Sequence, residues 1–247
     1  QNPHPLYNHF GSQMAKETAC QKLQIPNNKK NLLFFGLIRD YKGLDLLIDA
    51  VSHLDDSYQL IIAGECYGSF EKYQKQINNS PAKERIFVHN HYISDDDIPL
   101  FFSSADTLVL PYRSATQSGV VSIAYHYNLP MVSTPVGDFI QSIAEPQTGI
   151  VVPEISASAL KEGIQSLFED DKLKFIAQQI EKEKLIIVLV VLLSTLVLLI
   201  ACFYALKLEV SVGYYKCKHC GHEIVPTYSE ALWAMHCGTT RYLLCPN

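Results

Sequence analysis

One stretch of this sequence constrains its fold more than any other: Leu185–Leu206 contains 22 consecutive positions without a charged side chain. A helix of that length is roughly 33 Å long, enough to cross the hydrocarbon core of a bilayer. A buried helix or a pair of buried strands is the alternative, but core helices rarely lack polar residues on every side. The sequence therefore predicts a single membrane span over 185–206, between a long region, 1–184, and a short tail, 207–247.

Short apolar runs alternate with helical patterns through the long region. The runs predict six strands, at Asn31–Gly36, Tyr58–Gly64, Arg85–Asn90, Thr107–Pro111, Pro130–Thr134 and Thr148–Val152. These runs do not alternate between apolar and polar residues, which is typical of a parallel sheet covered on both faces. Strand and helix repeated in this way indicate an α/β fold with a doubly wound parallel sheet.

The helical segments between the runs have their own signals. Apolar residues recur at helical spacing from Leu44 to Leu54, and a polar helix is expected over Phe70–Ile77. Ser94 is predicted to cap a further helix whose first turn contains Asp95–Asp97. Three consecutive carboxylates point in different directions around a helix, so they favour a charged helix start over a metal site.

Composition and charge exclude one class of partner. The chain is 48% hydrophobic and 18% charged, which suits a protein with an ample core. Its formal net charge of −5 gives no general attraction to nucleic acid, so a nucleic-acid partner is not expected.

Two loops after predicted strands carry groups suited to an anionic sugar. Gly36, Arg39 and Lys42 follow the first strand, and a guanidinium and an ammonium group together suit a diphosphate. Gln117–Gly119 follow the fourth strand, with an amide that can bind sugar hydroxyls and exposed backbone N–H groups. Taken singly, these would be a solvated loop and a plain helix cap. Because ligands of such sheets bind beyond the carboxyl ends of the strands, the two loops together favour a ligand site.

The motifs HPLYNHFG, LLFFGLIRDYKGLDLLIDAV, LIIAGECYG, ADTLVLPYRSATQSGV and NLPMVSTPVGD together resemble the carboxyl-terminal half of a GT-B glycosyltransferase of the family 4 type. The resemblance runs from about His4 to about Lys184. It implies a Rossmann-like GT-B domain that binds a nucleotide-diphosphate sugar, in an enzyme that transfers the sugar to a hydroxyl acceptor. No catalytic metal is expected.

The same resemblance implies roles for individual residues. Gly36, Arg39 and Lys42 would hold the donor diphosphate, and Gln117, Ser118 and Gly119 would face the donor sugar and its phosphates. Tyr92 and Ile93 occupy the loop that usually contacts the base through backbone groups.

The sequence also departs from the family pattern. The family often carries two glutamates eight positions apart in this region, whereas no carboxylate lies between Gln117 and Pro130 here. Gly137-Asp138 stands in place of a Gly-Gly pair, and Gln141 in place of a downstream acid. The amino-terminal domain that completes the cleft of a GT-B enzyme is expected to be missing, so this half is expected to be inactive alone. No catalytic residue is assigned, because the histidines of the long region are scattered and lie beside no recognisable nucleophile.

The tail is rich in cysteine. Cys217 and Cys220 form a C-x-x-C followed by glycine, the usual shape of a zinc knuckle, and Cys245 would begin a second one. Cys237 or His236 could supply the fourth ligand; a redox pair or two idle thiols is the alternative. The tail resembles small bacterial zinc-ribbon proteins with a membrane helix. A membrane-anchored zinc-ribbon binding module with a non-catalytic α/β domain is therefore the alternative function.

Location raises a conflict. Nucleotide sugars are cytosolic, which predicts a single-pass membrane protein with the glycosyltransferase part in the cytoplasm. Zinc thiolates would then lie outside, where oxidation competes. Lysines flank the span almost equally on both sides, so charge does not decide the orientation. We infer as a hypothesis that two unrelated pieces are joined near Lys184.

Overall fold

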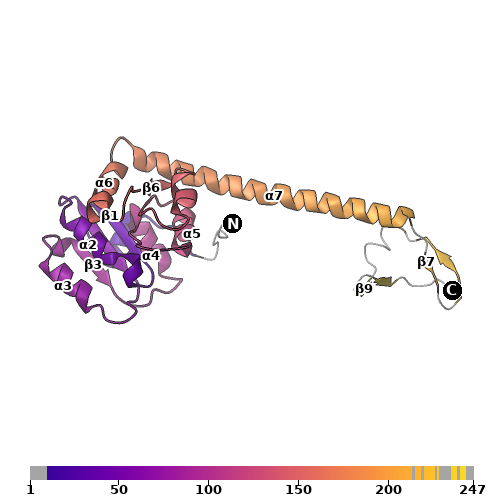
Figure 1. Cartoon of the computed structure of the whole chain (residues 1–247), viewed down its shortest axis with the longest axis horizontal. Coiled ribbons are helices and arrows are strands. Elements are labelled where there is room, and N and C mark those ends of the chain that lie inside the picture. Colours follow the sequence, from indigo (N-terminus) through magenta and orange to yellow (C-terminus); the bar gives the residue numbers. More distant parts are fainter. Residues whose placement is uncertain are drawn as a thin grey trace. The chain divides into compact units, whose positions relative to one another are not determined.

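A computed structural model describes residues 10–212, 215–217, 220–225, 227, 235–237 and 240–242 of the chain. The chain divides into two compact units, residues 1–184 and residues 185–247. Figure 1 follows both by colour along the sequence.

Six parallel strands form the sheet of the first unit, in the order β3-β2-β1-β4-β5-β6. They are β1 (Lys30–Phe35), β2 (Tyr58–Ala63), β3 (Ile86–His89), β4 (Thr107–Leu110), β5 (Met131–Ser133) and β6 (Gly149–Val151). All six predicted strands are present, each within one residue of its expected ends, and the doubly wound α/β fold is confirmed. β2 and β4 are buried at every position, as strands covered on both faces must be, while β6 at the edge is only half-buried.

Helices cover both faces of the sheet. On one face lie α2 (Leu44–Ser52), α3 (Glu71–Asn79) and α6 (Ala157–Leu167); on the other lie α1 (Lys16–Leu23), α4 (Ile98–Ser104) and α5 (Gly119–His126). α2 packs against both α3 and α6, and α1 packs against α4. Right-handed crossovers produce this division, because the connections change face where the strand order reverses. The described part of this unit also contains three short helical segments: the 3-10 turns η1 (Asp40–Lys42) and η2 (Lys83–Arg85), and the π-helical η3 (Ile140–Ala144).

The start of α4 differs from the prediction. The helix begins at Ile98 with Asp97 at its N-cap position, so Ser94 does not cap it. Ser94 instead opens a turn: its hydroxyl donates to Asp97 Oδ2 at 2.7 Å, and its carbonyl accepts from the Asp97 N–H at 3.0 Å. Pro99 in the first helical turn explains the later start, because proline fits best where helical N–H groups have no partner.

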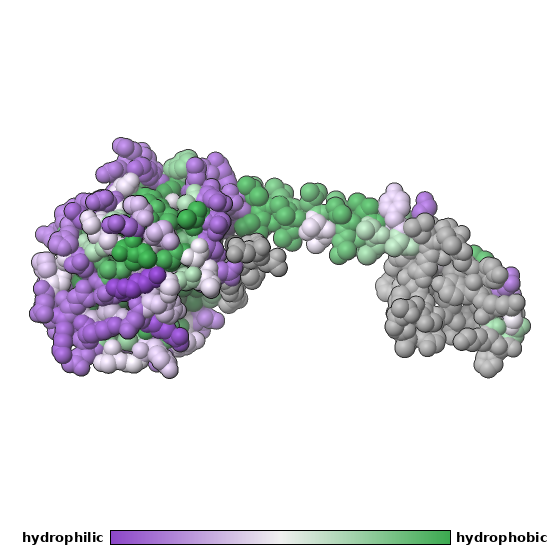
Figure 2. Space-filling model, viewed as in Figure 1, coloured by the Kyte–Doolittle hydropathy of each residue, from purple (hydrophilic) through white to green (hydrophobic). Residues whose placement is uncertain are grey.

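The predicted span lies inside a longer helix. α7 runs from Lys172 to Val212, beginning in the first unit and continuing into the second. Its large apolar side chains from Leu185 to Tyr204 are exposed, except for the half-buried Ile187, and Figure 2 shows a hydrophobic surface on the visible side of the helix. Within the described residues this is the one helix long and apolar enough to cross a membrane, over Lys172–Ala205.

Two small antiparallel hairpins follow in the second unit. β7 (Tyr215–Lys216) pairs with β8 (Glu223–Ile224), and β9 (Met235–Cys237) pairs with β10 (Thr240–Tyr242).

Candidate functional site

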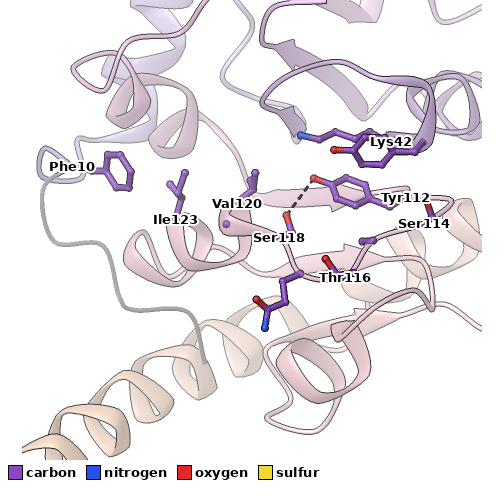
Figure 3. Close-up of a pocket in the computed structure, with 12 residues that line it drawn as sticks. Phe10, Lys42, Tyr112, Ser114, Thr116, Ser118, Val120 and Ile123 are labelled. Atoms are coloured by element: carbon purple, nitrogen blue, oxygen red, sulfur yellow. Dashed lines mark hydrogen bonds between the residues drawn. The ribbon is translucent and has the colours of Figure 1, made fainter. Parts of the chain in front are cut away.

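The candidate site lies where the strand order of the sheet reverses. β1 and β4 are neighbours there, and their carboxyl ends lead into residues 36–43 and 111–119. This switch point is where open α/β sheets bind ligands. A cavity of about 680 Å³ opens there (Figure 3). Its lining is Phe10, Tyr41, Lys42, Tyr112, Ser114, Ala115, Thr116, Gln117, Ser118, Gly119, Val120 and Ile123.

Lys42 is the cation of this cavity. Its side chain is only 8% exposed, and burial lowers its pKa from 10.5 to about 8, with a smaller contribution from the charge of Arg39. Nζ lies 5.5 Å from the centre of the Tyr112 ring. No carboxylate in the described part of the chain forms an ion pair with it. A buried ammonium group without a counter-ion is costly, since buried charges are normally paired.

Gly36 and Arg39 are placed differently from each other. Gly36 has a φ of +96°, and a Cβ there would lie 3.2 Å from Lys42 Nζ, so glycine leaves room for that ammonium. Arg39 is exposed, and its Cζ lies 4.9 Å from the centre of the Tyr67 ring. The structure thus brings Gly36 and Lys42 together, while Arg39 lies outside the lining.

The second loop supplies the polar wall. Gln117, Ser118 and Gly119 line the cavity together with the hydroxyls of Ser114 and Thr116. Ser118 occupies the N-cap position of α5, yet its side chain makes no cap hydrogen bond. Its Oγ lies 3.3 Å from the Tyr112 hydroxyl instead (Figure 3). The start of α5 is therefore not closed by its own capping residue.

The first and second loops approach each other closely. Gly43 has a φ of +65°, and a Cβ there would lie 2.0 Å from the Pro111 carbonyl oxygen. Only glycine permits this approach of the two backbones.

A third segment, after β5, supports the second loop. The Thr134 hydroxyl donates to the Tyr112 carbonyl at 2.5 Å, and the Asp138 N–H donates to the Thr116 carbonyl at 3.2 Å. A Cβ on Gly137 would lie 2.7 Å from the Ala115 carbonyl oxygen, so this glycine also serves a close approach.

Sequence reasoning missed the aromatic and apolar lining of the cavity. Tyr41 and Tyr112 pack edge to face with ring centres 6.2 Å apart, and burial raises the pKa of Tyr112 to about 12. Only Pro111 separates Tyr112 from the end of β4, so its place just beyond a strand end was the signal in the sequence. Phe10, Val120 and Ile123 form an apolar wall (Figure 3), which nothing in the spacing of polar residues indicates.

Tyr92 and Ile93 follow β3, outside the cavity lining. The Tyr92 side chain is 73% exposed and the Ile93 side chain is buried. The predicted contact with a base is made by their backbone groups. The exposure of the side chains does not test it, so it stays a prediction.

The predicted zinc ligands are only partly described. The Cys217 N–H donates to the His222 carbonyl at 2.8 Å, and the Gly221 N–H donates to the Cys217 carbonyl at 2.9 Å, which closes a tight hairpin around the C-x-x-C pair. Cys237 is described only as part of β9, and Cys245 lies outside the described residues. Where the structure describes the chain, no group of three or more His, Cys, Asp or Glu side chains could hold a metal ion.

Comparison with known protein families gives a match over most of the first unit. Residues 15–184 match the family described as glycosyl transferases group 1.

Curated proteins show the same similarity. A D-inositol 3-phosphate glycosyltransferase from Arthrobacter sp. is 27% identical over 154 residues, covering 60% of this chain and 37% of its own length. An uncharacterized glycosyltransferase from Methanocaldococcus jannaschii is 25% identical over 142 residues, covering 58% and 39%. The chain spans about two fifths of the length of these relatives.

Solved structures share the fold. HepE from Anabaena, in complex with UDP-glucose, superposes with a TM-score of 0.61 at 18% identity, over 68% of this chain and 46% of its own. The C-terminal domain of LpcC, a glycosyl transferase group 1 family protein from Francisella tularensis, gives 0.59 at 19% identity, over 69% of this chain and 91% of its own.

Proposed function

Because the chain belongs to the glycosyl transferases group 1 family, we propose that residues 1–184 bind the nucleotide-diphosphate sugar that donates the sugar in a glycosyl transfer to a hydroxyl acceptor. The proposed domain is the donor-binding half of a GT-B enzyme. Two solved structures of similar fold support it: HepE was solved with UDP-glucose, and the C-terminal domain of LpcC was crystallised.

One observation carries the proposal, the buried ammonium of Lys42. It has lost water and gained no anion from the described residues, and it faces a cavity at the switch point of the sheet. A diphosphate would supply the missing charge and accept a charge-assisted hydrogen bond, which is stronger than a neutral one. Binding of the diphosphate would therefore offset the free-energy cost of burying the ammonium group without a counter-ion.

The remaining site residues take roles by position. Gly36 leaves space beside the ammonium, and the exposed Arg39 could reach the outer phosphate. Gln117 would hydrogen-bond sugar hydroxyls, while Ser118 and Gly119 present the open start of α5 to a phosphate. Tyr92 and Ile93 would contact the base through their backbone.

Transfer needs more than this domain. A GT-B enzyme works between two domains, and the chain matches about two fifths of its relatives' length. We propose that an amino-terminal GT-B domain must complete the cleft, and that residues 1–184 alone bind donor without transferring the sugar. The proposed donor binding involves no catalytic metal.

We propose that α7 anchors this domain in a membrane through residues 185–206, with the donor site in the cytoplasm. The hydroxyls of Ser194 and Thr195 donate to the carbonyls of Val191 and Leu192, each at 2.8 Å. Neither hydroxyl would therefore enter lipid without a hydrogen-bond partner.

For the tail we propose a zinc site, because the C-x-x-C hairpin places two thiols at one turn. Cys217 and Cys220 would be two ligands, with Cys237 and Cys245 completing the set. Bound zinc would stabilise the fold of this small segment. Zinc analysis of the purified chain tests this directly.

Nucleotide titration calorimetry tests the donor site in the detergent-solubilised full chain, with UDP and GDP as probes. Lys42→Met keeps the apolar stem and removes the charge, so affinity should fall at least tenfold, because a hydrogen bond to a charged group contributes about 1.5–3 kcal/mol. Lys75→Met is the matched control: its ammonium pairs with Glu71 on the exposed face of α3, and its loss should leave affinity unchanged. If the wild-type chain binds neither nucleotide, the donor-site proposal is wrong.

A further inference from the structure

The turn that carries Lys42 is too short to fix its own orientation. It is one 3-10 turn, closed by the Lys42 N–H to the Arg39 carbonyl at 2.9 Å and by the Gly43 N–H to the Asp40 carbonyl at 3.2 Å. Such turns have poorer hydrogen-bond geometry than α-helices. The direction in which the ammonium points therefore depends on contacts from outside the turn.

Arg113, on the loop after β4, supplies those contacts. Its backbone N–H donates to the Tyr41 carbonyl at 2.6 Å, and its Nη1 donates to the Asp40 carbonyl at 3.2 Å. One residue thus holds two adjacent carbonyls of the turn from the neighbouring strand end.

The same guanidinium forms a bidentate ion pair with Asp45, in the first turn of α2. Nη1 lies 2.7 Å from Oδ1 and Nη2 lies 2.6 Å from Oδ2, the geometry that only arginine can form with a carboxylate. The hydrogen bonds from Arg113 lower the pKa of the Asp45 carboxyl, so the pair is charged on both sides at neutral pH. Arg113 therefore connects the second loop both to the Lys42 turn and to the helix that follows it.

Arg113 does not line the donor cavity. It lines a neighbouring depression of about 440 Å³ with Asp40, Tyr41, Asp45 and Lys72, and of these Tyr41 also lines the cavity. The cations of that depression already have partners, since Lys72 pairs with Asp40 and Arg113 with Asp45. A structural role fits this depression better than ligand binding.

We propose that the Arg113–Asp45 ion pair positions Lys42 against Gln117–Gly119, without itself touching the ligand. The inference rests on the function proposed above. Exposed ion pairs usually contribute little. This pair differs because its arginine also bonds the backbone of the turn that carries the buried cation.

Two substitutions separate charge from geometry. Asp45→Asn keeps the shape and removes the charge, while Arg113→Lys keeps the charge and removes the fork. In the full chain in detergent, each should weaken binding of UDP or GDP, whichever the wild type binds, at least fivefold. Each should also raise the pKa of Lys42, followed by lysine-selective NMR without ligand, because a loosened turn lets the ammonium reach water.

Glu71→Gln is the matched control, since it breaks the exposed Glu71–Lys75 pair, 2.8 Å long, on α3. It should change neither the affinity nor the titration. If the wild type binds neither nucleotide, the donor site fails, but a raised Lys42 pKa in both variants still supports the positioning role. The positioning role is wrong if the pKa of Lys42 in both variants equals the wild-type value. It is also wrong if both variants bind the nucleotide with the wild-type affinity. Should Asp45→Asn unfold, the milder Arg113→Lys decides.

Discussion

At the scale of single residues, Lys42 links stability to pH in an unusual direction. Its pKa in the folded chain, about 8, is below the ordinary 10.5, so between these values the unfolded chain binds more protons than the folded one. The free energy of unfolding therefore rises with pH in this window. A lysine with the same pKa in the folded and unfolded chain would contribute no such rise.

We expect the wild type to gain about 2 kcal/mol relative to Lys42→Met between pH 7 and pH 9.5. Urea unfolding of both proteins at the two pH values measures this difference. Measurements below pH 10 exclude a contribution from tyrosine ionisation. At higher pH the raised pKa of Tyr112 would make its ionisation destabilise the folded chain. Parallel curves for the two proteins would show that Lys42 is hydrated in solution.

Residue type alone was enough to predict Lys42 and Gly36 as phosphate-binding residues, because a glycine and a cation after a strand suit a phosphate. It could not predict that Lys42 turns inward while Arg39 packs on Tyr67, since both are long cationic side chains three positions apart. Nor did it predict Arg113–Asp45, because that pair joins residues 68 positions apart through the order of the strands.

At the scale of elements, continuous apolar runs marked the strands well, because central parallel strands are buried on both faces. Helix ends were less predictable: Ser94 had the right chemistry for a cap, but Pro99 moved the start of α4. The length of α7 was also missed, since its first turns are polar outside and bury only Ile176 and Ile180 inside.

Lys184 of α7 contacts the C-terminal end of α5, whose other end lines the cavity. Lys184 Nζ donates to the His126 carbonyl at 3.2 Å and to Asn128 Oδ1 at 2.9 Å, and a cation at a helix C-terminus is favourable. Lys184→Met should lower the free energy of unfolding by about 1 kcal/mol and speed hydrogen exchange in the last turn of α5. The exposed Lys182→Met is the control. Equal effects of the two changes would show that the contact adds no stability.

At the scale of the whole molecule, the question is whether α7 enters a membrane or only carries an apolar surface. Large apolar side chains are exposed from Leu185 to Tyr204, far more than a soluble helix normally leaves in water. A bilayer would cover these side chains on every side of the helix. A protein partner would cover them on one side only, and disrupting that side of α7 would release the chain from the partner.

Aspartate substitutions in the middle of the span distinguish these cases. Leu193→Asp with Val197→Asp places two carboxylates one turn apart, each costing about 3 kcal/mol at the centre of a membrane helix. The wild-type chain should resist extraction from membranes by alkaline carbonate, and the double aspartate variant should be released. Leu193→Ala with Val197→Ala, which keeps the segment uncharged, should behave as the wild type. Release of the wild type by carbonate would mean that α7 binds at a surface and does not span the bilayer.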